Sequence, residues 1–214
     1  MDYYCISGLG GDHRAFQYLQ LEGVELKPLK CLKPEPSETI ESYAARLAEG
    51  IDTTQEFGLI GLSFGGMLSV EISKIVKPKK LILISSILTK NELPLLYRLG
   101  GKTGLHRLLM PSMMKVVHPV LNGLRNSRRP EKRNIIAQML RESDNDFLEW
   151  ALATAANWQN ETMVEAYRIH GTTDWILPIR TDGINFKIQG GHLVIMTQAR
   201  KISEHLNSER ILLE

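Results

Sequence analysis

One short stretch, residues 57–66, constrains the fold of this chain more than any other. It reads Phe-Gly-Leu-Ile-Gly-Leu-Ser-Phe-Gly-Gly, an apolar run that ends in the pattern Gly-x-Ser-x-Gly. The run predicts the end of a buried strand, and the apolar spacing of residues 67–76 predicts a helix. Ser63 therefore falls on a sharp turn from strand to helix. Gly61 and Gly65 lack side chains, which lets the two backbones approach closely there.

Ser63 is a candidate nucleophile because of where this turn would place it. Its hydroxyl would stand exposed at the N-terminus of the helix, where free backbone N–H groups can stabilise an oxyanion. A Gly-x-Ser-x-Gly turn between a strand and a helix is typical of a nucleophile elbow. Glycine and serine also mark ordinary turns, so a plain strand-to-helix turn is the alternative.

Two later segments place an acid and a histidine after the serine. Residues 164–174 predict a strand and a glycine turn that ends at Asp174, and residues 184–188 lead into two glycines and His192. A histidine can take the serine proton and later protonate a leaving group, while a carboxylate orients the imidazole. Taken singly, Asp174 could stabilise a turn and His192 could cap a helix. The order serine, acid, histidine favours a catalytic role for all three.

With these motifs in this order, the chain resembles the α/β-hydrolase family over nearly its whole length. The resemblance implies an α/β fold with a reduced, mostly parallel sheet of about six strands flanked by helices. The two strands that begin the usual family sheet have no room in a chain of 214 residues. It also implies a helical lid of four or five short helices at residues 87–162, inserted into a core formed by residues 1–86 and 163–214.

The resemblance assigns a role to each of the three residues. Ser63 would attack the substrate, His192 would act as base and then as acid, and Asp174 would orient His192. One departure from the family lies between Asp174 and His192, where the connection is too short for a full helix. We expect it to be nearly extended or to hold one turn of helix, which puts the reach between these two side chains in doubt.

The loop after the first predicted strand is a candidate oxyanion hole. In the family, a His-Gly-apolar turn at this place supplies one backbone N–H, and here Ser7 stands at the histidine position. By resemblance, the donors are the backbone N–H groups of Leu9 and Phe64. Because both donors are main-chain groups, replacement of the family histidine by Ser7 leaves them available if the loop keeps its shape. The alternative is a glycine-rich loop without a catalytic role, while a dinucleotide-binding fingerprint is rejected because His13 stands where it needs glycine.

The rest of the core alternates short strands with helices, which predicts a parallel sheet covered on both faces. Two cysteines, Cys5 and Cys31, fall in or near apolar strands and read as small hydrophobic residues rather than a disulfide or metal pair. The remaining elements that we expect are strands at residues 3–6, 24–29 and 80–85, a short helix at 16–21, a helix from the N-cap Ser37 to about residue 51, and a closing helix at 193–206.

The predicted lid carries an unusual charge. Residues 90–133 contain ten Lys or Arg and two Glu, a net charge of +8, whereas the whole chain carries +2. The simplest interpretation of this charge is a solvated helix face. The alternative is a docking patch for an anionic partner, namely a coenzyme A thioester, an acidic carrier protein or an anionic lipid surface. Nucleic acid is not expected, because aromatic residues are not interleaved for base stacking. The densest cluster is Arg125, Arg128, Arg129, Lys132 and Arg133.

Together these features predict a serine hydrolase that cleaves a carboxylic ester or thioester through an acyl-enzyme, without a metal or organic cofactor. The layout is most similar to small carboxylesterases, including the carrier-protein methyl esterases of biotin synthesis. One alternative is the same fold used by a lyase, an acyltransferase or a cofactor-free oxygenase, and another is a non-enzymatic ligand-binding or scaffold protein. A cytoplasmic location is expected, because the sequence shows no signal segment and no apolar run of membrane-spanning length.

Overall fold

The computed structural model describes residues 1–95, 97–98, 130–208 and 211–212. Its strands are β1 (Asp2–Ile6), β2 (Glu25–Pro28), β3 (Phe57–Leu62), β4 (Lys80–Ile84), β5 (Tyr167–Gly171) and β6 (Phe186–Ile188). Its α-helices are α1 (Ile40–Ala48), α2 (Phe64–Ile75), α5 (Pro130–Glu142), α6 (Asn145–Asn157), α7 (Val194–Thr197) and α8 (Ala199–Ser208). Two 3-10 helices are η1 (His13–Ala15) and η2 (Lys90–Glu92).

Within these residues the strands form one six-stranded sheet in the order β2-β1-β3-β4-β5-β6, and every neighbouring pair is parallel. This confirms the predicted reduced parallel sheet. The chain runs from β1 out to β2 and then returns through α1 to β3 on the other side of β1. The strand order therefore reverses between β1 and β3, and the loops that leave the carboxyl ends of these two strands diverge. Ligands of open parallel α/β sheets bind in the crevice between such diverging loops.

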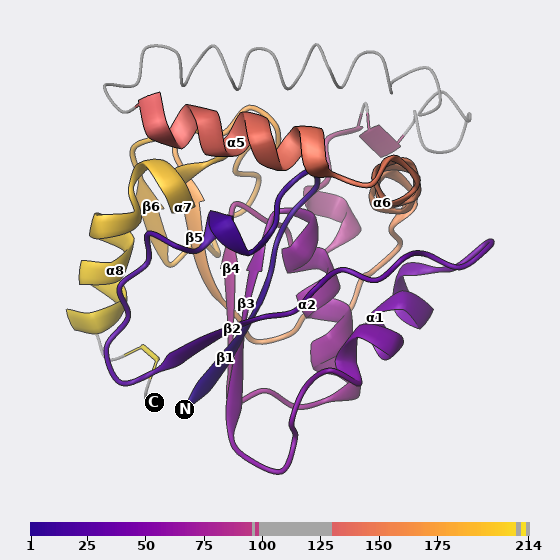
Figure 1. Ribbon diagram of the computed structural model, residues 1–214, viewed down its shortest axis with the longest axis horizontal. Helices are drawn as coiled ribbons and strands as arrows, with labels where there is room; N and C mark the ends of the chain where they lie inside the picture. Colours follow the sequence, from indigo (N-terminus) through magenta and orange to yellow (C-terminus); the bar gives the residue numbers. More distant parts are fainter. Residues whose placement is uncertain (96, 99–129, 209–210, 213–214) are drawn as a thin grey trace.

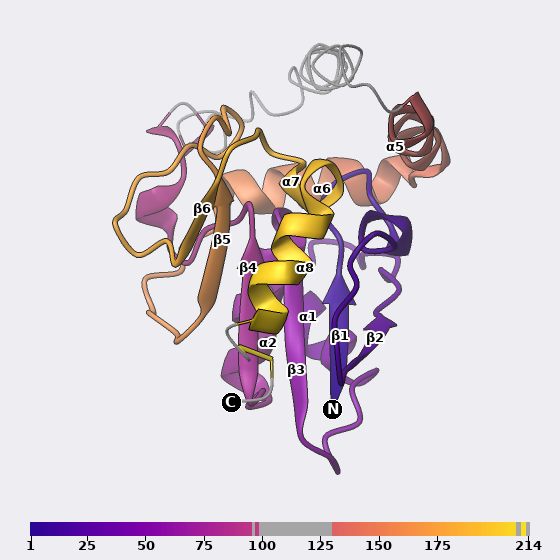
Figure 2. The same cartoon turned by 90° about the vertical axis from the view of Figure 1, so that its left-hand side faces the viewer.

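Helices cover both faces of this sheet, as Figures 1 and 2 show. On one side lie α1 and α2, and on the other lie α7 and α8. Successive residues of a strand point to opposite faces, so Leu59 packs in the core beneath α1 and α2 while Ile60 packs in the core beneath α7 and α8. All six residues of β3 are buried, which explains why this strand reads as a continuous apolar run.

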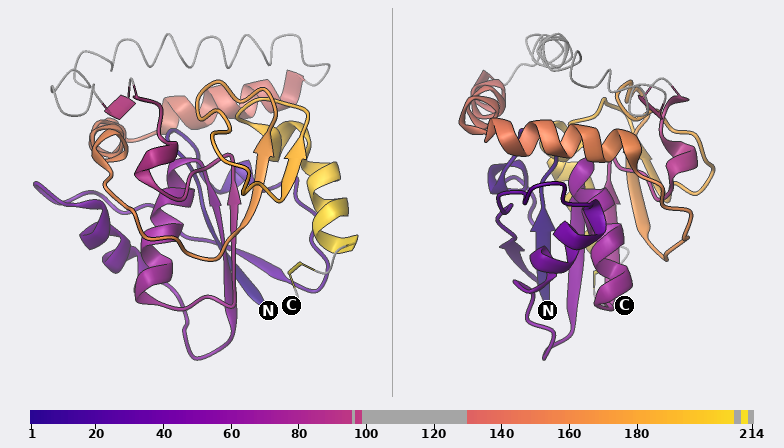
Figure 3. Two further views of the ribbon diagram at one scale, coloured as in Figure 1. Left: turned by 180° about the vertical axis from the view of Figure 1, so that it is seen from behind. Right: turned by 90° about the vertical axis from the view of Figure 1, so that its right-hand side faces the viewer.

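Helices α5 and α6 lie across the carboxyl ends of the strands, at the end of the sheet opposite the N-terminus (Figure 3). An aromatic cluster fixes α6 there. The ring of Phe64, the first residue of α2, lies with its centroid 6.4 Å from that of Phe147 and 5.9 Å from that of Trp150. The indole N–H of Trp150 also donates a hydrogen bond of 2.8 Å to the carbonyl of Glu38. The helices expected between residues 99 and 129 lie outside the described residues.

Three predicted helix boundaries are wrong. The short helix at residues 16–21 is instead the 3-10 turn η1, which ends at Ala15. The N-cap of α1 is Thr39, whose hydroxyl accepts from the N–H of Ser42 at 3.2 Å, whereas Ser37 lies two residues before it in the left-handed region, with a φ of +58°. The closing helix is broken into α7 and α8 at Gln198, whose backbone leaves the helical region.

Both cysteines are reduced, and their burial follows the prediction. Cys5 is buried in β1, and this burial raises the pKa of its thiol to about 12. Cys31 is half-buried and packs against the core on the α1 side. Such thiols behave as small apolar side chains. In the described ranges, no helix combines the length and apolarity needed to cross a bilayer.

The close approach of α2 to β3 gives a first testable prediction. A β carbon at Gly61 would lie 2.4 Å from Cα of Gly66 and 2.7 Å from the carbonyl oxygen of Gly65, both backbone atoms. We expect Gly61→Ala to lower the free energy of unfolding by about 1–3 kcal/mol, measured by urea denaturation. At Gly50 the nearest atoms are 3.3 and 3.4 Å away, so Gly50→Ala should change it by less than about 0.5 kcal/mol. Equal losses would contradict this account.

Candidate active site

Ser63 occupies a strained turn between β3 and α2. Its φ is +54° with ψ of −121°, a conformation that costs an L residue free energy and that the surroundings must enforce. Two hydrogen bonds do so: the N–H of Ser63 donates to the carbonyl of Ile84 at 3.0 Å, and the hydroxyl of Ser86 donates to the carbonyl of Ser63 at 2.6 Å. The predicted sharp turn at Ser63 is therefore present, braced from the end of β4.

The structure brings Ser63, His192 and Asp174 together at the carboxyl end of the sheet. Nε2 of His192 lies 2.8 Å from the hydroxyl oxygen of Ser63, and Nδ1 lies 2.8 Å from Oδ2 of Asp174. An ionised carboxylate can only accept, so Nδ1 carries the proton and Nε2 is left to accept from the serine hydroxyl. The arrangement connects hydroxyl, imidazole and carboxylate in one line, as general-base activation of a serine requires.

The short connection after Asp174 does not prevent this contact. Residues 172–185 contain no helix, and β6 returns directly beside β5. The N–H of Thr172 donates to the carbonyl of Ile188 at 2.9 Å, and that of Thr173 donates to the carbonyl of Gly190 at 2.9 Å. These bonds tie the loop that carries Asp174 to the loop that carries His192, so the predicted extended connection is sufficient.

Asp174 is enclosed and saturated with hydrogen-bond donors. Its side chain has no exposed surface, and Oδ1 accepts from the backbone N–H groups of Ile176 and Leu177, each at 3.0 Å. Burial by itself would raise the pKa of Asp174, but the imidazoles of His170 and His192 and the Leu177 amide outweigh it and hold that pKa below its usual range. The carboxylate is therefore ionised at neutral pH, ready to stabilise a charged His192.

His170 is a residue that the sequence analysis missed. Its side chain is buried, and its Nε2 lies 3.1 Å from Oδ2 of Asp174. The signal was present in the run His-Gly-Thr-Thr-Asp, because a histidine four residues before an acid, across a glycine turn, can fold back onto that acid. The same run was used only to place Asp174.

The predicted oxyanion donors lie at the same place. Phe64 is the first residue of α2, where helix amides have no partner within the helix. Among the described residues, no acceptor takes the N–H of Leu9. The loop that carries Leu9 also lies against the elbow, since a β carbon on Gly8 would sit 2.9 Å from Cβ of Ser63. Both amides therefore border the space in front of the serine hydroxyl, and their role stays a prediction.

A cavity of about 270 Å³ opens over Ser63. Both Ser63 and His192 line it, as do Leu9 and Phe64. Of the described lining side chains, those other than Ser7, Ser63, Tyr97 and His192 are apolar or glycine. From the helices above the sheet it receives Ile136, Met139 and Leu140 of α5 and Leu152, Ala155 and Ala156 of α6.

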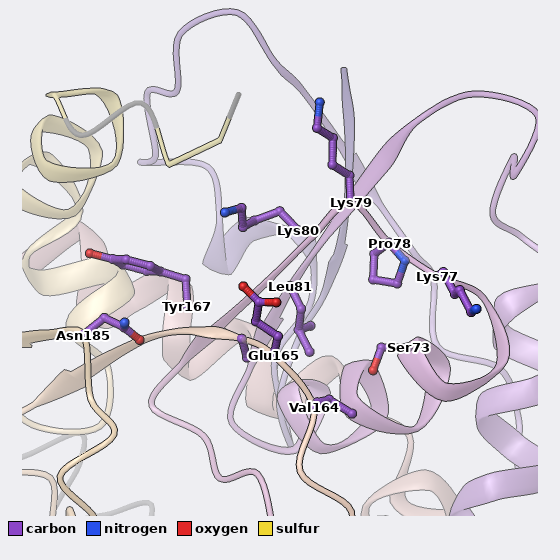
Figure 4. A pocket seen from close by; sticks show the side chains of 11 residues that line it. Ser73, Lys77, Pro78, Lys79, Lys80, Leu81, Val164, Glu165, Tyr167 and Asn185 are labelled. Carbon is purple, nitrogen blue, oxygen red and sulfur yellow. The ribbon is translucent and has the colours of Figure 1, made fainter. Parts of the chain in front are cut away.

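A second hollow, of about 370 Å³, lies at the opposite end of the sheet (Figure 4). It is polar, with Lys77, Lys79 and Lys80 before and within the start of β4, and with Glu165 and Asn185 near β5. The hydrogen-bonded line of Ser63, His192 and Asp174 lies at the other end of the strands. We therefore place the candidate active site in the smaller, apolar cavity.

The predicted anionic-partner patch is mostly outside the described residues. Arg125, Arg128 and Arg129 fall there, as does the side chain of Arg133. Lys132 is described, and its side chain is buried rather than solvated. Its ammonium donates to the carbonyl of Met196 and lies 4.2 Å from the ring centroid of Tyr18. Lys132 thus fastens α5 to the core and does not belong to a solvent-facing patch, while the rest of the patch stays a prediction.

Comparison with solved structures decides the fold. A thermophilic esterase from Thermogutta terrifontis matches with a TM-score of 0.74 and 16% identity, over 99% of this chain and 90% of that chain. The RedJ thioesterase of prodiginine biosynthesis in Streptomyces coelicolor matches with a TM-score of 0.66 and 17% identity, over 97% and 85%. An enol-lactonase from Burkholderia xenovorans LB400 matches with a TM-score of 0.69 and 16% identity, over 100% and 91%.

The chain has the α/β-hydrolase fold. This is the fold that the elbow and the order serine, acid, histidine predict. No protein-family model matches the sequence, and a search of curated proteins gives no match either. At identities below 20% the structural likeness establishes the α/β-hydrolase fold alone, so the activity must be argued from the site.

The lowered pKa of Asp174 predicts how stability depends on pH. A carboxyl whose pKa is lower in the folded than in the unfolded state stabilises the fold above its unfolded value of about 3.9. That contribution is lost as the pH falls toward the folded-state pKa. We expect the difference in unfolding free energy between the wild type and Asp174→Asn to stay constant from neutral pH to about pH 4 and to shrink below it, measured by urea denaturation. A difference independent of pH would contradict this.

Proposed function

We propose that the protein is a serine hydrolase that cleaves a carboxylic ester or thioester through an acyl-enzyme intermediate. The observation that carries the proposal is the pair of 2.8 Å contacts that His192 makes, one to Ser63 and one to Asp174. These contacts occur at the mouth of an apolar cavity that the serine hydroxyl borders. A nucleophile, a base, an orienting acid and a binding space therefore occupy one site.

The proposed reaction follows from these positions. The hydroxyl oxygen of Ser63 attacks the carbonyl carbon while Nε2 of His192 takes its proton, and the negative oxygen of the tetrahedral intermediate receives hydrogen bonds from the amides of Leu9 and Phe64. His192 then gives the proton to the departing alkoxide or thiolate, which leaves the acyl group on Ser63. A water molecule, deprotonated by His192, then attacks the acyl carbon. The bond from that carbon to Oγ of Ser63 breaks, His192 returns the proton to Oγ, and the carboxylic acid leaves.

The lining of the cavity supports an uncharged acyl group. Apart from the reactive pair, the polar side chains among its described lining residues are Ser7 and Tyr97. Burial and the negative charge of Asp174 raise the pKa of Tyr97, so this phenol is neutral at physiological pH. With no cation on the described walls, a charged acyl terminus would lose its hydration without gaining a partner.

The proposal is tested by the kinetics of p-nitrophenyl octanoate hydrolysis. We expect a burst of p-nitrophenolate that matches the enzyme concentration, because this activated ester acylates the enzyme faster than water attacks the acyl-enzyme, which therefore accumulates. Ser63→Ala should abolish the burst and lower kcat by about 10⁴-fold or more. Ser73→Ala, on the same helix but outside the cavity lining, is the matched control and should keep both. An active Ser63→Ala would overturn the proposal.

Acyl selectivity gives a second test. We expect kcat/KM for p-nitrophenyl hexanoate to exceed that for the mono-p-nitrophenyl ester of adipic acid, which has the same chain length but ends in a carboxylate. Burying a polar group without a partner costs about 1–3 kcal/mol, so the ratio should be about 5- to 150-fold. Equal rates for the two esters would show that the acyl group does not enter the apolar cavity.

A further inference from the structure

His170 lies on β5, at the base of the loop that carries Asp174. Its Nε2 is 2.7 Å from the carbonyl oxygen of Leu177 and 3.1 Å from Oδ2 of Asp174. A carbonyl and an ionised carboxylate have no proton to donate, so Nε2 must carry one and donate it. The ring is therefore held in one tautomer, with its N–H directed at the two acceptors.

The imidazole of His170 also completes a ring of hydrogen bonds around the turn that carries Asp174. Oδ1 of Asp174 accepts from the N–H of Leu177, and the carbonyl of Leu177 accepts from His170. Both backbone groups of Leu177 are thereby bound to the two side chains, and the N–H of Ile176 also donates to Oδ1. Asp174, the turn that follows it and His170 form one closed hydrogen-bonded unit inside the core.

Oδ2 of Asp174 consequently lies between two imidazoles. Nδ1 of His192 is 2.8 Å away and Nε2 of His170 is 3.1 Å away. The guanidinium of Arg168, which is also buried, points elsewhere, since it donates to the carboxylate of Glu92. His170 is therefore a second imidazole within hydrogen-bonding distance of Oδ2, besides that of His192.

We propose that His170 is a positioning residue that holds the Asp174 carboxylate in line with His192. The inference rests on the proposed function and deepens it, since it assigns to the site a fourth side chain. His170 is absent from the described cavity lining, so it acts through Asp174 and not on the substrate. Without His170, the carbonyl of Leu177 loses its donor and Oδ2 loses the imidazole beside it. The carboxylate then keeps its bonds from the loop amides to Oδ1, but its alignment with Nδ1 of His192 is less constrained.

The test compares two substitutions of His170. His170→Gln keeps an N–H donor near the position of Nε2, whereas His170→Leu keeps the bulk and removes the donor. We expect His170→Leu to lower kcat by about 10- to 100-fold, because small displacements of catalytic groups have effects of this size. KM should change by less than about twofold, since the side chain of His170 is not part of the described cavity wall, and His170→Gln should stay within about threefold of the wild type. An unchanged kcat in His170→Leu overturns the inference.

A double-mutant cycle separates positioning from general destabilisation. In the Asp174→Asn background the carboxylate is gone, so His170→Leu should cost less than about threefold more in kcat. A structural role without positioning would give the same loss in both backgrounds, and that result overturns the inference. Thermal unfolding of all four proteins, followed by circular dichroism, shows that each is folded at the assay temperature.

Proton NMR keeps this inference separate from the proposed function. The Nδ1–H of His192 donates to a buried carboxylate, so it should give a far-downfield resonance in wild type and in His170→Gln, with or without ester hydrolysis. We expect this resonance to move upfield or broaden in His170→Leu. If the wild type hydrolyses no ester, the proposed function fails while this spectral change can still be observed. If the resonance is identical in His170→Leu, the positioning role fails.

Discussion

The close contact between α2 and the sheet is the constraint on which the rest of this structure depends. Helix and strand backbones meet at Gly61 and Gly65, where a β carbon would collide with main-chain atoms of the neighbouring segments. That approach accompanies the positive φ of Ser63, whose hydroxyl lies against Nε2 of His192. It also brings the first amide of α2 toward the loop after β1, because a β carbon on Gly65 would lie 2.1 Å from the carbonyl oxygen of Ile6.

Asp174 and His192 are brought to Ser63 by the loops that follow β5 and β6, without a helix between these two strands. β5 and β6 are adjacent and parallel, and hydrogen bonds between the loops that leave them replace the helix that usually joins such strands. This arrangement buries the carboxylate of Asp174 on a short loop. Two backbone amides and the imidazoles of His170 and His192 surround the carboxylate of Asp174 and compensate for its lost hydration. Stability and proposed catalysis therefore depend on one hydrogen-bonded unit.

The sequence predicted the sheet and placed Ser63, Asp174 and His192 near strand ends, because glycine spacing and apolar runs are local signals. Other features depend on packing. Nothing local shows that Lys132 turns inward to the carbonyl of Met196, since its neighbours are charged and read as a solvated face. His170 shares one face of β5 with Arg168, and the alternation of polar and apolar residues does not show that both polar side chains are buried. Its contact with Asp174 needs the turn geometry, which one sequence does not specify.

The central claim is that this geometry activates Ser63 as a nucleophile. It is tested most directly by treatment with a fluorophosphonate, followed by intact-mass measurement and peptide mapping. The account predicts one adduct on the wild type, located on Ser63, none on Ser63→Ala, and a strongly reduced rate of labelling in His192→Gln, where the base is missing. No adduct on the folded wild type, or an adduct on another residue, would contradict it.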